Sequence, residues 1–477
     1  MIFYIIGNIM KVEAALLLLP LIVEMAYNEH TLLAFLVPMA LLFTLGLALS
    51  IKPPKKKMFY AREGFLTVAL SWVILSVFGA LPFYLSGEIP SFVDALFETI
   101  SGFTTTGASI LTDVEALPHS MLFWRSFTHW IGGMGVLVFV LAILPQSNDG
   151  NNMHLLRAEV PGPTVGKLVS KMKLTARILY GIYIFMTAAE VVLLCMGGMP
   201  LFDSLAHAFG TAGTGGFGIK NTSIAFYDSA FIDGVITVFM ILFGVNFNLF
   251  YFIVAGHAMR ALRSEELRWY LGIIAVSIAL ITANISHMYG SVLHALRYAA
   301  FQVASIITTT GYATADFNAW PVFSQMILVL LMFLGASAGS TGGGLKTARV
   351  IVLLKTGWRE LRHMFQPRSQ VAVRLEGKNV NADTANSIQV FFFVYMLVYA
   401  GSVLLLSLDG FDFVTTSTAV AACLNNIGPG LGAVGPTGNF AGFSDLGKCL
   451  LSFNMLAGRL EIFPMLMLFV PAVWRNR

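Results

Sequence analysis

Threonine and glycine recur together in three short runs of this 477-residue sequence, and a fourth, looser run has asparagine and glycine; these residue types could hold a dehydrated cation. The runs cover residues 104–109, 213–218, 308–313 and 425–430, and they align on Gly107, Gly216, Gly311 and Gly428, about a hundred residues apart. In an ion filter, backbone carbonyl oxygens replace the water shell of the ion. Glycine allows the backbone angles that point neighbouring carbonyls toward one axis. Four such runs in one chain therefore predict an ion-selective pore.

The predicted ion contacts are the aligned glycines and the residues just before them. They are Thr105, Thr106, Gly107, Thr214, Gly215, Gly216, Thr309, Thr310, Gly311, Asn426, Ile427 and Gly428. A carbonyl-lined site without a ring of carboxylates suits a monovalent cation better than calcium or magnesium. A single run is explained better by an ordinary turn at a helix end, but four runs, each between a short and a long apolar segment, favour the filter. The fourth run lacks threonine, so its ion contacts stay open.

A second candidate segment, residues 335–347, reads GASAGSTGGGLKT and interrupts an otherwise apolar stretch. We expect a flexible intramembrane loop that blocks or opens the inner half of the pore, because consecutive glycines break a helix. Its candidate gating residues are Gly335, Gly339, Gly342, Gly343, Gly344 and Lys346, together with Arg459 in the last apolar helix. A small-residue surface for tight helix packing is the alternative for the segment. For Arg459 the alternative is a structural pair with Glu461 or with loop carbonyls.

The elements that must position these residues belong to a membrane protein. Apolar residues make up 57% of the chain and charged residues only 11%, whereas an ordinary soluble domain has about 25% charged residues. Apolar stretches of about 20 residues, the length that crosses a bilayer, recur from end to end. The predicted fold class is therefore an all-α polytopic membrane protein.

Two N-terminal helices, at 2–27 and 31–51, precede a pattern of long helix, short helix, loop and long helix that occurs four times. The short helices are expected at 91–103, 201–212, 292–307 and 412–424, and the returning long helices at 119–145, 230–258, 321–352 (interrupted) and 441–472. The predicted division is an N-terminal helix pair at 1–57 and pore repeats at 58–172, 173–267, 268–385 (with the gating loop) and 386–477. Four such repeats around one axis make a pseudo-tetrameric, potassium-channel-like pore from one chain.

Charge gives an independent test of the topology. Most Lys and Arg lie in the segments predicted to be cytoplasmic, beginning with the basic run at 52–57, and the predicted outer loops are mainly acidic. Basic loops face the cytoplasm as a rule. The pattern predicts ten crossings with both termini in the cytoplasm.

These features together resemble the TrkH/KtrB/HKT superfamily of potassium transporters, and the two extra N-terminal helices favour its TrkH branch. The resemblance rests on the four loops, on the glycine-rich segment and on residues 458–461 (GRLE), and it covers essentially the whole chain. It implies inward conduction of K⁺, gated by the intramembrane loop and the pore arginine. Some sodium-favouring relatives carry serine at the first filter glycine, so Gly107 argues for potassium.

The resemblance also implies partners and a location. Proteins of this branch are homodimers in the bacterial cytoplasmic (inner) membrane that bind a cytosolic ring of TrkA-like nucleotide-binding regulatory subunits. Nucleotide would then bind to that ring and not to this chain, and nothing in the sequence points to nucleic acid. The basic inner loops, with Arg359 and Arg362, are a candidate docking face for the ring.

Two other function classes are weaker. A secondary carrier that couples K⁺ or Na⁺ uptake to another ion by alternating access is expected to have inverted repeats, but the repeats here run in the same orientation. A membrane enzyme would need paired carboxylates, a metal motif or a nucleophile with its base. His207 or His294 alone on a short helix makes no such set, so we do not expect an enzyme.

Overall fold

The structure is a computed structural model of residues 1–477, and it describes residues 1–52, 61–135, 172–368 and 372–474. Its described secondary structure is helical except for a short antiparallel hairpin of β1 (Arg374–Leu375) and β2 (Lys378–Asn379). Among the described residues, six helices are long and apolar enough to cross a membrane, and one bent pair brings the number to seven. This agrees with the predicted multi-pass, mostly helical membrane protein. The count of ten crossings stays a prediction.

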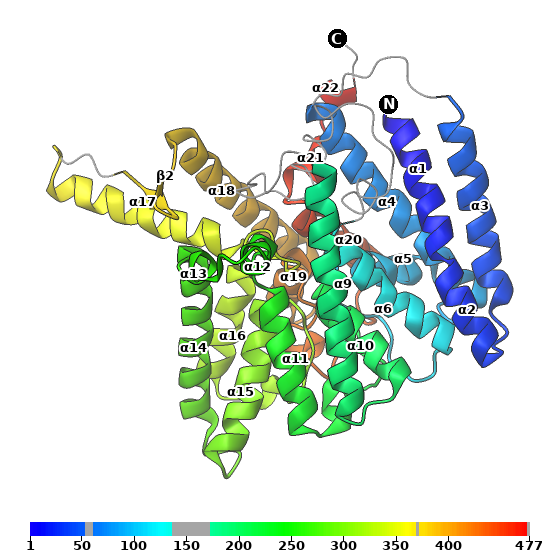
Figure 1. Ribbon diagram of the computed structural model, residues 1–477, viewed down its shortest axis with the longest axis horizontal. Helices are drawn as coiled ribbons and strands as arrows, with labels where there is room; N and C mark the ends of the chain where they lie inside the picture. The colour runs from blue at the N-terminus through cyan, green and yellow to red at the C-terminus, as the bar shows by residue number, and fades with distance from the viewer. Residues whose placement is uncertain (53–60, 136–171, 369–371, 475–477) are drawn as a thin grey trace.

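The N-terminal helices form a closely packed pair beside the rest of the molecule. The predicted first helix consists of α1 (Ile2–Leu16) and α2 (Leu18–Tyr27), which together are long enough to span, and α3 (Leu32–Ser50) returns against α1. A Cβ on Gly7 or on Gly46 would lie 2.8 Å from the carbonyl oxygen of the other glycine. Small residues let membrane helices approach closely, and here they fix the crossing that places the pair against α4 at the right of Figure 1.

Four long helices alternate with four short ones, as the apolar pattern predicts. The long helices are α4 (Ala61–Ser86), α9 (Met172–Met196), α14 (Glu265–Ile285) and α18 (Ala382–Leu406), and the short ones are α5 (Phe92–Phe103), α10 (Leu201–Gly213), α15 (Val292–Ile307) and α19 (Phe413–Leu424). Two short helices begin at side-chain caps, because Ser91 accepts from Asp94 N–H and Asp412 accepts from Val414 N–H. Each short helix ends at one of the Thr/Gly runs.

The returning helices are shorter than predicted. They are α6 (His119–Gly133), α11 (Ala230–Phe243), α16 (Val322–Leu334) and α20 (Asp445–Arg459). The prediction of unbroken helices at 230–258 and 441–472 is wrong: α12 (Phe247–Val254) leaves α11 at 95°, and α21 (Phe463–Met467) follows a separate break. The first return ends at Gly133, and the rest of its predicted range, beyond residue 135, lies outside the described residues. Only the third interruption, before α17 (Thr347–Phe365), was expected.

Close approach explains two of these breaks. A Cβ on Gly132 would lie 1.9 Å from the Phe103 carbonyl oxygen, and a Cβ on Gly458 would lie 2.0 Å from that of Leu424. Each glycine therefore lets a return helix touch the last residue of a short helix. The contact is made where the return helix ends.

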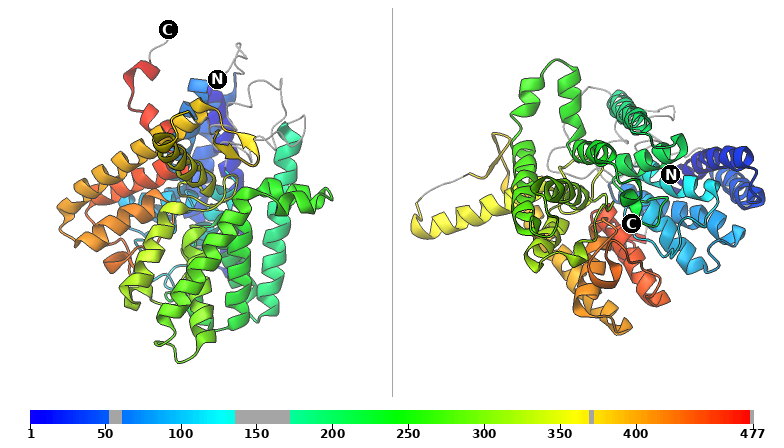
Figure 2. Two further views of the ribbon diagram at one scale, coloured as in Figure 1. Left: turned by 90° about the vertical axis from the view of Figure 1, so that its left-hand side faces the viewer. Right: turned by 90° about the horizontal axis from the view of Figure 1, so that it is seen from below.

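The four helix hairpins follow one another around a centre in chain order when the molecule is seen from below (Figure 2). In the first hairpin, the fully buried Trp72, Phe103 and Trp124 pack α4, α5 and α6 together, and the Trp124 indole donates to the Gly79 carbonyl at 3.0 Å. Helix α17 extends sideways from the body in both figures. The remaining elements are α13 (Ala258–Leu262), α22 (Pro471–Trp474), η1 (Ser223–Tyr227), η2 (Phe317–Ala319), η3 (Ser407–Asp409) and η4 (Gly432–Val434).

Candidate functional site

The four Thr/Gly runs share one backbone conformation. In each run the aligned glycine and the residue two positions before it have positive φ: Thr105 55° and Gly107 78°, Thr214 57° and Gly216 73°, Thr309 60° and Gly311 86°, Asn426 56° and Gly428 95°. Threonine and asparagine rarely adopt this left-handed region unless the surroundings hold them there. The fourth run, although it lacks threonine, therefore folds like the other three.

The runs meet in a closed ring. A Cβ built on each aligned glycine would lie against a carbonyl oxygen of the next run. The distances are 2.0 Å from Gly107 to the Gly215 oxygen and 1.9 Å from Gly216 to the Thr310 oxygen. They are 2.1 Å from Gly311 to the Ile427 oxygen and 2.8 Å from Gly428 to the Thr106 oxygen. Each of these oxygens belongs to the residue just before the aligned glycine of the next run, and the fourth contact returns to the first run. Four carbonyl oxygens thus surround one axis, with glycine required at every contact.

Hydroxyl groups hold the first and third runs from behind. Thr104 and Thr106 share a hydrogen bond of 2.8 Å, and so do Thr308 and Thr310 at the equivalent positions. The Thr104 hydroxyl also contacts the Ile100 carbonyl at 2.6 Å. These contacts are buried, so the threonines form the wall behind the ring.

In the fourth run, amide side chains make the hydrogen bonds behind the ring. The Asn426 Nδ2 group donates to Thr106 Oγ1 at 3.0 Å and to the Met455 carbonyl at 2.9 Å. The Tyr395 hydroxyl donates to Asn425 Oδ1 at 2.9 Å. The asparagines therefore tie the fourth run to the first run and to α20, which explains the departure from the threonine pattern.

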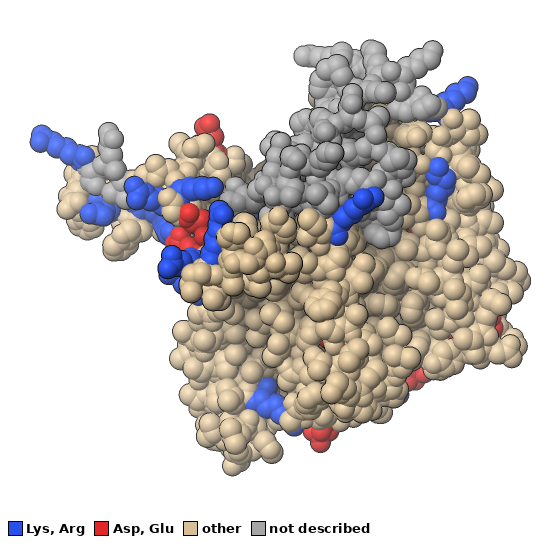
Figure 3. Space-filling model, viewed as in Figure 1, with Lys and Arg blue, Asp and Glu red and all other residues tan. Residues whose placement is uncertain are grey.

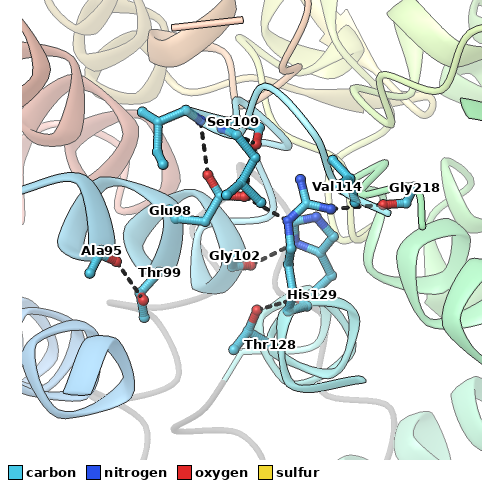
Figure 4. Close-up of polar contacts among 12 residues, drawn as sticks. Ala95, Glu98, Thr99, Gly102, Ser109, Val114, Thr128, His129 and Gly218 are labelled. Carbon is cyan, nitrogen blue, oxygen red and sulfur yellow. Dashed lines mark hydrogen bonds and ion pairs between the residues drawn. The ribbon is translucent and has the colours of Figure 1, made fainter. Parts of the chain in front are cut away.

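A buried ion pair joins the first and second runs (Figure 4). Glu98 on α5 accepts from Arg125 Nε at 2.6 Å, from Ser109 Oγ at 3.0 Å and from Ile110 N–H at 3.0 Å. Arg125 also donates to the Gly218 carbonyl at 2.8 Å. The sequence pattern did not indicate this pair. A lone Glu on a short apolar helix, 27 positions before the Arg, was the only available signal.

The glycine-rich segment lies against the third and fourth runs. Gly343 N–H donates to Thr309 Oγ1 at 2.7 Å, and a Cβ on Gly343 would lie 2.4 Å from the Asn425 carbonyl oxygen. A Cβ on Gly342 would lie 2.9 Å from that of Thr308. No larger residue fits between this segment and the ring at these two positions.

The two ends of the segment lie against each other, and its middle packs into the break between α11 and α12. A Cβ on Gly344 would lie 2.8 Å from the Gly335 Cα, and both glycines have positive φ. Gly339, also at positive φ, accepts from Phe247 N–H at 3.1 Å, and Ser337 N–H donates to the Gly244 carbonyl at 3.0 Å. The Lys346 ammonium donates to the Gly342 carbonyl within the segment.

Arg459, at the end of α20, connects the segment to the opposite side of the ring. Its guanidinium donates to the Thr341 carbonyl at 2.8 Å and to the carbonyls of Gly132 and Gly133, at 2.5 and 2.8 Å, at the end of α6. Glu461 forms its ion pair with Arg349 of α17. Of the two alternatives for a structural role of Arg459, the structure contains the contact with loop carbonyls.

Two other ion pairs lie near the short helices. Lys448 on α20 lies 2.6 Å from Asp94 on α5, and Arg297 on α15 lies 2.7 Å from Asp233 on α11. These pairs join a short helix to a return helix. They hold the scaffold together on the side of the ring away from the glycine-rich segment.

Comparison with known proteins places the whole chain in one group. The sequence profile of the TrkH family, described as a cation transport protein, matches residues 34–476. The Trk system potassium uptake protein TrkH of Salmonella typhimurium is 37% identical over 99% of this chain and 98% of its own length. TrkG of Escherichia coli is 34% identical over 96% and 95%. The crystal structure of the potassium transporter TrkH from Vibrio parahaemolyticus superposes with a TM-score of 0.88 at 33% identity, covering 99% of both chains. The chain belongs to the TrkH family of cation transport proteins.

Proposed function

We propose that this protein is the ion-conducting subunit of a potassium uptake system, and that it passes K⁺ and Rb⁺ inward through the ring formed by the four Thr/Gly runs. One observation carries the proposal: each aligned glycine abuts the carbonyl oxygen before the next glycine, and the four contacts close on themselves. Relatives that match over nearly the full chain are named as potassium uptake proteins, which supports the choice of ion.

The ring has the chemistry that a dehydrated monovalent cation needs. Its contacts are carbonyl oxygens, and α5, α10, α15 and α19 end beside it with their C-termini. The C-terminal end of a helix carries partial negative charge, so four such ends stabilise a cation. Gly107, Gly216 and Gly311 are partly exposed and Gly428 is buried, so three of the four aligned glycines are accessible from a pathway.

The glycine-rich segment and Arg459 supply the gate in this proposal. The segment lies across the third and fourth runs. The Arg459 guanidinium places a positive charge between Thr341 and α6, to both of which it donates. A fixed positive charge beside a cation pathway raises the barrier to cation passage. Opening then requires the segment to leave Thr309 and Arg459 to release Thr341.

The remaining assignments follow from charge and family membership. Lys and Arg gather over α17 and the hairpin (Figure 3), which supports a cytoplasmic position for that face by the positive-inside rule. We place both termini in the cytoplasm, the protein in the bacterial inner membrane as a homodimer, and the TrkA-like nucleotide-binding ring on this basic face. Names of relatives that refer to a Trk system support further components.

Flux of K⁺, Rb⁺, Na⁺ and Li⁺ into proteoliposomes, compared for the wild type and Gly107→Ser, tests the function. We expect K⁺ and Rb⁺ to outrun Na⁺ and Li⁺ in the wild type. The selectivity should be lost in the variant, because the new Cβ collides with the Gly215 carbonyl oxygen, 2.0 Å away. Equal flux of all four ions, unchanged by the substitution, would assign the Thr/Gly runs a structural role and remove the basis of the proposal.

A further inference from the structure

A single carboxylate holds both ends of the glycine-rich segment. Glu266, the second residue of α14, is buried, and its Oε1 accepts from Ala338 N–H at 2.6 Å. The backbone N–H of Ala348, in the first turn of α17, also interacts with this side chain. Ala338 precedes the three consecutive glycines and Ala348 follows them. Glu266 therefore clamps the stretch that touches the ring.

The clamp lies at the start of a helix, where backbone N–H groups need acceptors. The first N–H groups of a helix have no partner within the helix, and an anionic group near them is stabilised by the helix dipole. Glu266 lies at this position, at the start of α17. A buried N–H that loses its acceptor is costly, so the closed arrangement of the segment depends on this side chain, which accepts from Ala338 N–H.

The clamp is in turn connected to the hairpin. Glu376, between β1 and β2, accepts from Glu266 N–H at 3.0 Å and from Ser264 Oγ at 2.7 Å. Glu265 accepts from Glu376 N–H at 3.2 Å and pairs with Lys355, which also donates to the Arg374 carbonyl at 2.7 Å. A displacement of the hairpin thus changes the position of the backbone that carries Glu266.

We propose that Glu266 is the positioning residue that keeps the glycine-rich segment closed, and that the hairpin sets its position through Glu376. The inference rests on the proposed function, because it assumes that the segment gates a K⁺ pathway. It adds two things: the group that holds the gate, and a route by which binding at the basic face reaches it. Moving the hairpin frees Ala338 and Ala348 without any contact to the ring.

The test measures unstimulated K⁺ and Na⁺ flux into proteoliposomes for the wild type, Glu266→Ala, Glu266→Gln and Glu360→Gln. Glu360 is a carboxylate on the exposed side of α17, paired with Arg359, and serves as the matched control. We expect Glu266→Ala to raise K⁺ flux about tenfold, the ratio that corresponds to about 1.4 kcal/mol. The ratio of K⁺ to Na⁺ flux should stay that of the wild type, because no contact to the ring changes. Glu266→Gln keeps an accepting oxygen, so its K⁺ flux should lie between that of the wild type and that of Glu266→Ala.

The outcomes separate the inference from the proposed function. K⁺-selective wild-type flux that is equal in Glu266→Ala, Glu266→Gln and Glu360→Gln would overturn the clamp and leave the pore intact. A wild type without K⁺ selectivity would contradict the pore itself. If Glu266→Ala does not fold, the rise in Glu266→Gln over Glu360→Gln decides the question.

A double-mutant cycle tests the route from the hairpin. Glu376→Ala removes the bonds to Ser264 and Glu266 N–H, and we expect it to raise unstimulated flux by less than Glu266→Ala does. The double variant Glu266→Ala, Glu376→Ala should have the same unstimulated flux as Glu266→Ala alone, because both changes act on one contact. Strictly multiplicative effects would show that the hairpin acts elsewhere and would overturn the route.

Discussion

At the scale of single residues, Arg459 makes contacts that only the folded chain could reveal. Its sequence position marks it as unusual, because a charge within a membrane helix is costly and is a functional candidate by default. Its partners, the carbonyls of Thr341, Gly132 and Gly133, lie more than 100 positions away. They are backbone groups, which every residue possesses, so no residue type in the sequence could have indicated them.

We expect Arg459→Ala to increase unstimulated K⁺ flux about tenfold or more. It removes a positive charge and charge-assisted hydrogen bonds, which contribute about 1.5–3 kcal/mol each. The measurement is K⁺ flux into proteoliposomes, with Arg362→Gln, an exposed arginine of α17, as the control of equal charge change. Flux in Arg459→Ala that matches Arg362→Gln would show that this guanidinium does not close the pathway.

At the scale of elements, the ends of the return helices depend on glycines that touch short helices. Gly132→Ala should lower the thermal midpoint in detergent and reduce flux, because the Cβ would lie 1.9 Å from the Phe103 carbonyl oxygen. Overpacking of this kind costs about 1–3 kcal/mol. Gly272→Ala in α14, where a Cβ would meet no atom within 4 Å, is the matched control and should change stability by less than about 1 kcal/mol. Equal midpoints for the two variants would contradict the close contact.

The short helices were predictable because length and polarity mark them. The expected range 292–307 coincides with α15, and 91–103 differs from α5 by one residue at its start. The breaks in the return helices were not predictable in the second and fourth repeats. Isolated glycines such as Gly244 and Gly458 are common in membrane helices, and only their contact with another element shows that the helix ends there.

At the scale of the whole molecule, the ring could be anticipated from the recurrence of four runs, but its closure could not. Closure depends on the order in which four distant segments meet, and the sequence contains only their spacing. The position of the glycine-rich segment likewise depends on long-range contacts: Glu266 lies 72 positions from Ala338. Neither Glu266 nor Glu98 belongs to a motif, which is why both were missed.

The ring is not fully symmetric, and this makes a graded prediction. The distance from a Cβ to the nearest carbonyl oxygen is 2.8 Å at Gly428 and between 1.9 and 2.1 Å at Gly107, Gly216 and Gly311. Serine at Gly428 should therefore reduce the ratio of K⁺ to Na⁺ flux least among the four glycine-to-serine variants, measured side by side in proteoliposomes. A larger loss at Gly428 than at the other three positions would contradict the geometry.

The asparagine pair of the fourth run also has an evolutionary consequence. In a channel made of four identical subunits, one change in the gene alters all four loops at once. Here the four loops are encoded separately, so one of them can change while the other three stay the same. Asn426 makes bonds to Thr106 and Met455. Separate encoding thus allows one quarter of the ring to tie the fourth run to the first run and to α20.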